Sequence, residues 1–180
     1  MGILALTACT SQVEKEAEQP WIVDRFDDIK VIRYEVPGFE SLSLEEKELI
    51  YYLAEAAKCG RDILFDQNFK YNLSVRRTLE SIYTATEERE GEEFKAFEKY
   101  LKKVWFANGI HHHYSNDKFK PEFSEAWFRE QLAKYINDDN RQLEDDFLCQ
   151  IIFDETLYAS RLNQTAGVDV IKSSANNYYE

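Results

Sequence analysis

The feature that most constrains the fold is a set of apolar stripes that repeat at the spacing of an α-helix. In one segment the large apolar side chains recur every three or four residues, at Phe94, Phe97, Leu101, Val104 and Trp105. Lysine and glutamate occupy most of the positions between them, so the predicted helix has one apolar face and one charged face. Glycine and proline, which interrupt helices, number only 6 and 3 among 180 residues. The chain is therefore predicted to be a mainly helical array.

Four further segments share this periodicity and are predicted to be helices. The first begins at a capping box, Ser43 to Glu46, in which each side chain binds a backbone N–H at the start of the helix. This helix either closes at Gly60 or runs on through Ile63 and Leu64. The other predicted helices span residues 71–83, 124–136 and 143–157.

One segment has the alternation of a β-strand. Residues 29–36 alternate β-branched with polar side chains and stop at Pro37 and Gly38. We find no other good strand candidate in the sequence. The expected fold class is thus mainly α, with one short N-terminal strand.

The composition excludes some partners. A hydrophobic fraction of 44% is enough to bury a core, and 180 residues correspond to one domain or to a piece of a larger one. The 34 acidic residues outnumber the 22 basic residues, which gives a net charge of −12. Nucleic acids and anionic membrane surfaces both require clustered lysine and arginine, so neither is an expected partner.

The N-terminus carries a possible export signal. The apolar residues 2–8 precede Cys9, and the run from Leu6 to Cys9 fits the bacterial lipobox, in which the cysteine is lipid-modified. The basic start of a secretory signal is missing, so either translation begins further upstream or the segment is not a signal. The polar, glutamate-rich residues that follow predict a flexible tether.

Two regions follow from this reading: residues 1–20 as a lipoprotein signal remnant with its tether, and residues 21–180 as the folded part. The protein is expected in the periplasm or at a membrane, held there only by its lipid, because no segment reaches the roughly 20 apolar residues of a membrane span. If Cys9 is not a lipobox cysteine, the expected location is the cytoplasm.

All three histidines of the chain are adjacent, at His111, His112 and His113, just after the predicted helix stop at Gly109. In an extended segment the first and third point to the same side, a spacing that fits one metal ion, and zinc would need a third ligand such as Asp117. A free imidazole could also act in catalysis, because it titrates near neutral pH.

Two other interpretations of this segment remain open and are favoured over a metal site. In one, the imidazoles, with Asn108 and Asp117, hydrogen-bond to buried backbone and hold a long loop in place. In the other, an ordered loop lines the substrate cleft of a larger enzyme.

The two remaining cysteines, Cys59 and Cys149, lie far apart in helical patterns. Without a CxxC pair they indicate neither a structural zinc site nor a redox motif. Two cysteines of an exported protein could pair, but we expect two buried thiols.

The histidine segment and its flanks resemble the bacterial, Bacteroides-type branch of the dipeptidyl peptidase III family. The resemblance covers nearly everything after about Trp21, and family members are several times longer than this chain. The matching blocks are Val23–Phe26, Arg33–Glu40, Cys59–Asn72 and Asn108–Phe119.

The resemblance implies the N-terminal portion of a two-lobed α+β zinc metallopeptidase that removes dipeptides from peptide N-termini. The family's zinc motifs, His-Glu-x-x-Gly-His and Glu-Glu-x-x-Ala followed by an acidic residue, are absent here. No histidine is followed by glutamate. The best partial match to the second motif, Glu92 to Ala96, has Phe97 at the acidic position. We assign this partial match no role.

The resemblance therefore implies that this chain alone binds no zinc and cleaves no peptide. The catalytic and zinc-binding residues would come from the missing C-terminal part of the same chain, and the peptide substrate would bind to the whole enzyme. The positions that can be transferred, as signature residues of a loop that lines the cleft, are Asn108, Gly109, His111, His112, His113 and Tyr114.

Two alternatives stand beside the enzyme fragment. One is a self-contained helical lipoprotein that binds a peptide or a protein without catalysis. The other is a small metal-binding lipoprotein that uses His111 and His113.

Overall fold

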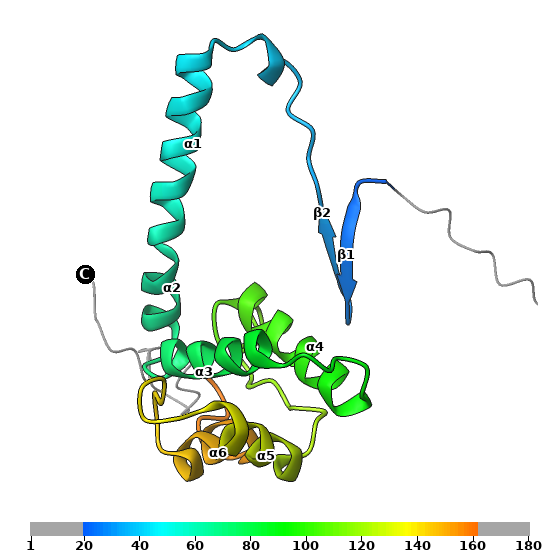
Figure 1. Ribbon diagram of the computed structural model, residues 1–180, viewed down its shortest axis with the longest axis vertical. Coiled ribbons are helices and arrows are strands. Elements are labelled where there is room, and N and C mark those ends of the chain that lie inside the picture. Colours follow the sequence, from blue (N-terminus) through cyan, green and yellow to red (C-terminus); the bar gives the residue numbers. More distant parts are fainter. Residues whose placement is uncertain (1–19, 162–180) are drawn as a thin grey trace, which may run out of the picture. The chain divides into compact units, whose positions relative to one another are not determined.

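The computed structural model describes residues 20–161 and shows the expected mainly helical protein. Six α-helices and one two-stranded sheet lie within these residues (Figure 1). The chain divides into two compact units between Pro37 and Gly38, and each is described by itself below. Cys9, most of the expected tether and the chain after Arg161 lie outside the described residues.

The first unit contains an antiparallel hairpin of β1, Ile22–Phe26, and β2, Ile29–Ile32. The prediction of one strand reaching residue 36 was wrong in both number and length. β1 was missed because Asp24 occupies an inward position and interrupts the apolar alternation of Ile22 and Phe26. β2 ends early because β1 offers only five residues for pairing, and one further bond joins the Arg33 N–H to the Trp21 carbonyl oxygen.

The second unit begins with a short 3₁₀ turn, η1, Phe39–Ser41, followed by α1, Leu44–Cys59. The predicted capping box is confirmed: the Glu46 carboxylate accepts from the Ser43 N–H at 2.8 Å, and the Ser43 hydroxyl accepts from the Glu46 N–H. Gly60 then separates α1 from α2, Arg61–Asn68, which continues the line of α1 (Figure 1).

The core of the second unit is built from the predicted stripes. The helices that carry it are α3, Asn72–Ala85; α4, Glu92–Ala107; α5, Glu125–Tyr135; and α6, Asp145–Phe153. α3 lies at the centre, against α2, α4 and α5, and α5 also packs against α6. In these four helices, the aromatic and aliphatic side chains predicted to form apolar faces lie in the core or pack against it. Those fully buried include Val75, Leu79, Ile82, Phe97, Leu101, Val104, Phe128, Leu148 and Ile151.

α6 is shorter than the predicted segment 143–157. Its C-terminal end is set by Asp154, whose side chain accepts hydrogen bonds from the backbone N–H groups of Thr156 and Leu157. This local turn offers the backbone an alternative to another helical turn, so the helix ends at Phe153.

α1 differs from the other helices because none of its residues is buried. Its apolar side chains are nevertheless numerous, and they lie on more than one side of the helix. The exposed apolar residues of α1 are Leu44, Leu49, Ile50, Tyr51, Tyr52 and Leu53, and α2 adds Ile63 and Leu64.

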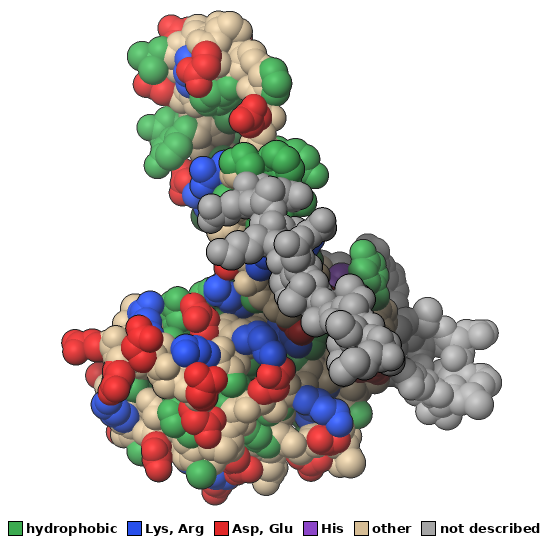
Figure 2. Space-filling model, turned by 90° about the vertical axis from the view of Figure 1, so that its right-hand side faces the viewer, with side chains coloured by type: hydrophobic (Ala, Val, Ile, Leu, Met, Phe, Trp, Pro, Cys, Tyr) green, Lys and Arg blue, Asp and Glu red, His purple; other side chains and the backbone are tan. Residues whose placement is uncertain are grey.

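Over α3 to α6, the face shown in Figure 2 has acidic and basic side chains interspersed, without a basic patch. Within the described part of the chain, no helix has the length and apolar character needed to cross a membrane.

Candidate functional site

The candidate site is the histidine loop, residues 108–118, which leaves the end of α4. The helix ends at Ala107, two residues before the predicted stop at Gly109, because Asn108 adopts a left-handed conformation with φ of 53°. Asparagine tolerates this conformation better than most residues. Gly109 follows with φ of 149°, and a Cβ at this position would lie 2.1 Å from Nδ2 of Asn72. The loop therefore requires glycine here.

Asn72 is the buried polar residue that positions the start of the loop. Its Nδ2 donates to the carbonyl oxygens of Phe65, at 3.1 Å, and of Asn108, at 3.3 Å. Its Oδ1 accepts from the Ile110 N–H at 3.1 Å. One amide thus joins α2, α3 and the histidine loop. This role was not predictable from the sequence, because a single asparagine at the start of a helix carries no signal of contacts nearly 40 residues away.

His111 is buried, with 4% of its surface exposed. Its Nε2 donates to the Tyr158 carbonyl oxygen at 2.9 Å, and its ring meets the Phe69 ring edge-on at 5.2 Å between centroids. Nδ1 is buried without a hydrogen-bond partner. Burial lowers the pKa of this imidazole, and the hydrogen bond to Tyr158 partly opposes that shift.

His112 shapes the tip of the loop instead. Its Nδ1 accepts from the backbone N–H groups of Tyr114 and Ser115, each at 3.2 Å. Its ring stacks on that of His113, with 4.5 Å between centroids. The tip is thereby closed into a compact turn.

His113 and Tyr114 complete the outer part of the loop. The His113 ring meets Phe106 edge-on at 5.0 Å and lies 4.2 Å from the Tyr114 ring. Tyr114 is 82% exposed and Phe106 is 46% exposed. The loop thus has a buried base at His111 and an exposed aromatic tip.

The three imidazoles therefore have three different environments. The Nε2 of His111 is already engaged by a carbonyl oxygen, whereas the ring of His113 packs against Phe106. Among residues 20–161, no three histidine, cysteine, aspartate or glutamate side chains are grouped so that they could hold a metal ion. The geometry gives the metal hypothesis for His111 and His113 no support.

The loop is fastened to a second piece of chain, the clasp segment, residues 154–161. Isolated β-bridges join His111 to Lys118 within the loop and Asp117 to Ser160 between the two pieces. The Lys118 N–H donates to the Ala159 carbonyl oxygen at 2.8 Å, and the Arg161 N–H donates to that of Asn116 at 2.9 Å.

Two cations strengthen this fastening. The Lys118 ammonium donates to the carbonyl oxygens of Ile151, Asp154 and Leu157, so it caps the C-terminal end of α6. The Arg161 guanidinium donates to the side-chain oxygens of Asn68, at 2.8 Å, and of Asn116. The base of the loop is thus joined by hydrogen bonds to both α2 and α6.

The two glutamates of the partial motif match, Glu92 and Glu93, both bind other residues of the fold. The Glu93 carboxylate accepts from the backbone N–H and the hydroxyl of Ser124, both at 2.8 Å, and so connects the start of α4 to the start of α5. Glu92 is paired with Lys95 at 3.1 Å. Phe97, at the position where the family motif has an acidic residue, is fully buried.

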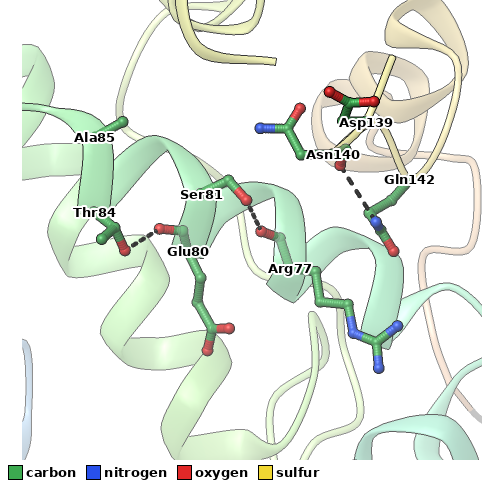
Figure 3. Close-up of a pocket in the computed structure, with 8 residues that line it drawn as sticks. All are labelled: Arg77, Glu80, Ser81, Thr84, Ala85, Asp139, Asn140 and Gln142. Atoms are coloured by element: carbon green, nitrogen blue, oxygen red, sulfur yellow. Dashed lines mark hydrogen bonds between the residues drawn. The ribbon is translucent and has the colours of Figure 1, made fainter. Parts of the chain in front are cut away.

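A separate pocket of about 660 Å³ lies between α3 and the turn at residues 139–142 (Figure 3). Its hydroxyl groups are satisfied within their own helix: Ser81 donates to the Arg77 carbonyl oxygen and Thr84 to that of Glu80. The arrangement has no nucleophile paired with a base, so it gives no support to catalysis in this pocket.

Both described cysteines are free thiols, and the prediction that both are buried was wrong for Cys59. Cys149 is buried in α6, and burial raises its pKa to about 11, so it is an unreactive thiol at neutral pH. Cys59 is exposed because it lies at the end of α1, where no residue is buried.

No protein-family model matches this chain, and no curated protein matches it.

Proposed function

We propose that this chain is the N-terminal portion of a zinc-dependent dipeptidyl peptidase whose zinc-binding and catalytic residues are encoded later in the same polypeptide. The ordered blocks that resemble the dipeptidyl peptidase III family supply the enzyme class. Zinc belongs to the whole enzyme in this proposal, and the residues described here supply structure and one wall of the cleft.

The main observation in support of the proposal is the exposed apolar surface of α1. Leu49, Tyr52 and Leu53 are 59, 67 and 60% exposed, and they do not form one narrow stripe. A helix that is apolar on several sides belongs in the interior of a larger protein. Apolar surface of this extent marks a contact with further protein. In the proposal, that protein is the later part of the same polypeptide.

The histidine loop fits the wall of a cleft. Its base is held by Asn72 and His111, and its tip presents Tyr114. Binding sites combine a rigid support with exposed aromatic side chains, which bury much area at a small cost in conformational entropy. We assign the loop contact with the peptide substrate, without a catalytic role.

The test is to extend the reading frame and to assay the longer protein. We expect the frame to continue beyond Glu180 into His-Glu-x-x-Gly-His and the paired-glutamate motif. The extended protein should release dipeptides from dipeptidyl arylamides, lose this activity with 1,10-phenanthroline and regain it with Zn²⁺. The 180-residue chain should release none under the same conditions.

An in-frame stop directly after Glu180 would refute the proposal. So would an extended protein that carries both motifs, binds zinc and yet fails to cleave any of a panel of N-terminally free peptides.

The second candidate, a helical lipoprotein that binds a peptide or a protein, is favoured by the same exposed α1 surface. It differs in requiring no further chain. It predicts a stop codon at the end of this frame and a lipid on Cys9, detected as incorporation of labelled palmitate that Cys9→Ser abolishes.

A further inference from the structure

The clasp segment is attached to the histidine loop through a buried histidine. His111 lies at the base of the loop and reaches the main chain of Tyr158, which has a left-handed conformation with φ of 54°. A bulky residue adopts this conformation only where its surroundings enforce it. The contact with His111 is one of the interactions that hold Tyr158 in place, and the rings of Phe69 and Tyr158 lie edge-on at 5.0 Å.

The hydrogen bond fixes the protonation state of the imidazole in the closed clasp. The Tyr158 carbonyl oxygen can only accept, so Nε2 must carry the hydrogen. In the neutral ring, Nδ1 is then the bare nitrogen, and it is buried without a partner. A second proton could only add at Nδ1, where it would place a charge in a site that offers that proton no acceptor.

The charged groups around His111 make such a charge less favourable still. Arg161 of the clasp segment and Lys118 of the loop both act against a positive imidazole, and Asp117 acts in its favour. On the side of Phe69, the Lys70 ammonium lies 5.6 Å from the centre of the Tyr158 ring. Two cations, Arg161 and Lys118, thus oppose a positive charge on the imidazole, and the Asp117 carboxylate favours it.

From this geometry we infer that His111 is a pH-sensitive latch: its protonation releases the clasp segment from the histidine loop while the helical core stays folded. The core stripes of α3 to α5 contain no histidine, because all three histidines lie in the loop. Acid therefore acts on the latch before it acts on the core.

The direction of the pH effect follows from linkage. Burial lowers the pKa of His111 below its ordinary value near 6.5, so the closed clasp binds fewer protons than the open one. The latch contributes its full stability above about pH 6.5. This contribution decreases as the pH falls through that value, and it levels off below the lowered pKa of the closed state.

Amide hydrogen exchange of the full 180-residue chain, measured by NMR at pH 7.5 and pH 5.0 and corrected for intrinsic rates, tests the latch. We expect protection of the Lys118 and Arg161 amides, which bond across the clasp, to drop at pH 5.0. The drop should be about tenfold for each unit by which the pKa is lowered, up to a limit of about thirtyfold at pH 5.0. Protection of the Leu101 amide, inside α4, should be unchanged.

Two variants separate the latch from the rest of the loop. In His111→Gln, the side-chain amide can still donate to Tyr158 but cannot titrate, so protection at Lys118 and Arg161 should not depend on pH. The matched control His112→Asn also removes one imidazole, and its side-chain oxygen keeps an acceptor for Tyr114 and Ser115. This control should behave like the original chain.

Equal protection at both pH values in the original chain overturns the latch, and so does an undiminished pH effect in His111→Gln. A parallel loss at Leu101 would show global unfolding and would also overturn it. If His111→Gln does not fold, the original chain still decides the matter. The Hε1 titration of His111 must then share its midpoint with the loss of protection, and separate midpoints refute the latch.

Discussion

At the scale of single residues, Asn72 and Gly109 together fix the start of the histidine loop. The buried amide of Asn72 holds the Ile110 N–H, and the missing side chain of Gly109 makes room for that amide. The position of the Asn72 amide therefore depends in part on the absence of a side chain at Gly109.

A double-mutant cycle measures this dependence. Asn72→Ala leaves the buried Ile110 N–H without an acceptor and should lower the free energy of unfolding by about 2 kcal/mol in urea titrations. Gly109→Ala should cost at least as much, because of its positive φ and the clash with Asn72. In the Asn72→Ala background the clash is absent, so Gly109→Ala should cost clearly less.

Ser81→Ala is the control for this cycle, since the Ser81 hydroxyl bonds only its own helix. Its effect should stay within about 0.5 kcal/mol. Strictly additive costs for the two loop substitutions would contradict the contact between Asn72 and Gly109.

The sequence predicts the role of some single residues but not of others. Val104 and Leu101 were predictable as core residues, because periodicity is a local property and burial follows from it. Asn72 and Lys118 were not predictable. The bond of Asn72 to Ile110 and those of Lys118 to Ile151 and Leu157 span 33 to 39 residues, and hydrogen bonds of that separation leave no local pattern.

At the element scale, the C-terminal end of α6 depends on a side chain from outside the helix. Lys118 supplies a charged donor to three carbonyl oxygens at this end, including those of Ile151 and Leu157. Hydrogen bonds from a charged group contribute more than neutral ones, and the end of a helix favours positive charge.

Lys118→Met should therefore lower the free energy of unfolding by about 1.5–3 kcal/mol in urea titrations. It should also raise amide exchange in the last turn of α6. Lys120→Met is the matched control, because Lys120 forms only an ion pair with Glu155 in which both side chains are mostly exposed. The control should change the stability by less than about 1 kcal/mol. Equal effects of the two substitutions would contradict the capping role.

The elements themselves were predicted well where a cap or a stripe was complete. Ser43 and Ser124 begin α1 and α5 as expected, because each hydroxyl accepts from a backbone N–H three residues later. β1 was missed and α6 was overextended for local reasons, an inward Asp24 and a turn formed by Asp154.

At the scale of the whole molecule, the sequence predicted the mainly helical fold class, but it did not predict that the apolar side chains of α1 are exposed. The stripe of α1 resembles those of α3 and α4, and periodicity cannot show whether a partner lies beside a helix. The role of the histidine loop in substrate binding stays a prediction of the resemblance.

The exposure of α1 predicts the behaviour of the isolated chain. The double substitution Leu49→Glu and Leu53→Glu should reduce self-association, measured by light scattering, and binding of the dye ANS, with no loss of helical circular dichroism. In a buried stripe, Leu101→Glu should abolish folding, because it places an unpaired charge in the core. If the two substitutions in α1 unfold the chain as Leu101→Glu does, then α1 is packed in solution.

The exposed apolar surface of α1 has a consequence for the synthesis of the protein in the cell. About 120 residues follow Cys59 in this sequence. At about 5–20 residues per second, the ribosome needs about 6–24 seconds to add them. Under the proposed assignment, α1 is among the first helices to emerge and among the last to be covered. For at least that time its exposed leucines and tyrosines can bind a holdase near the exit tunnel, so the yield of folded protein should depend on the supply of chaperones.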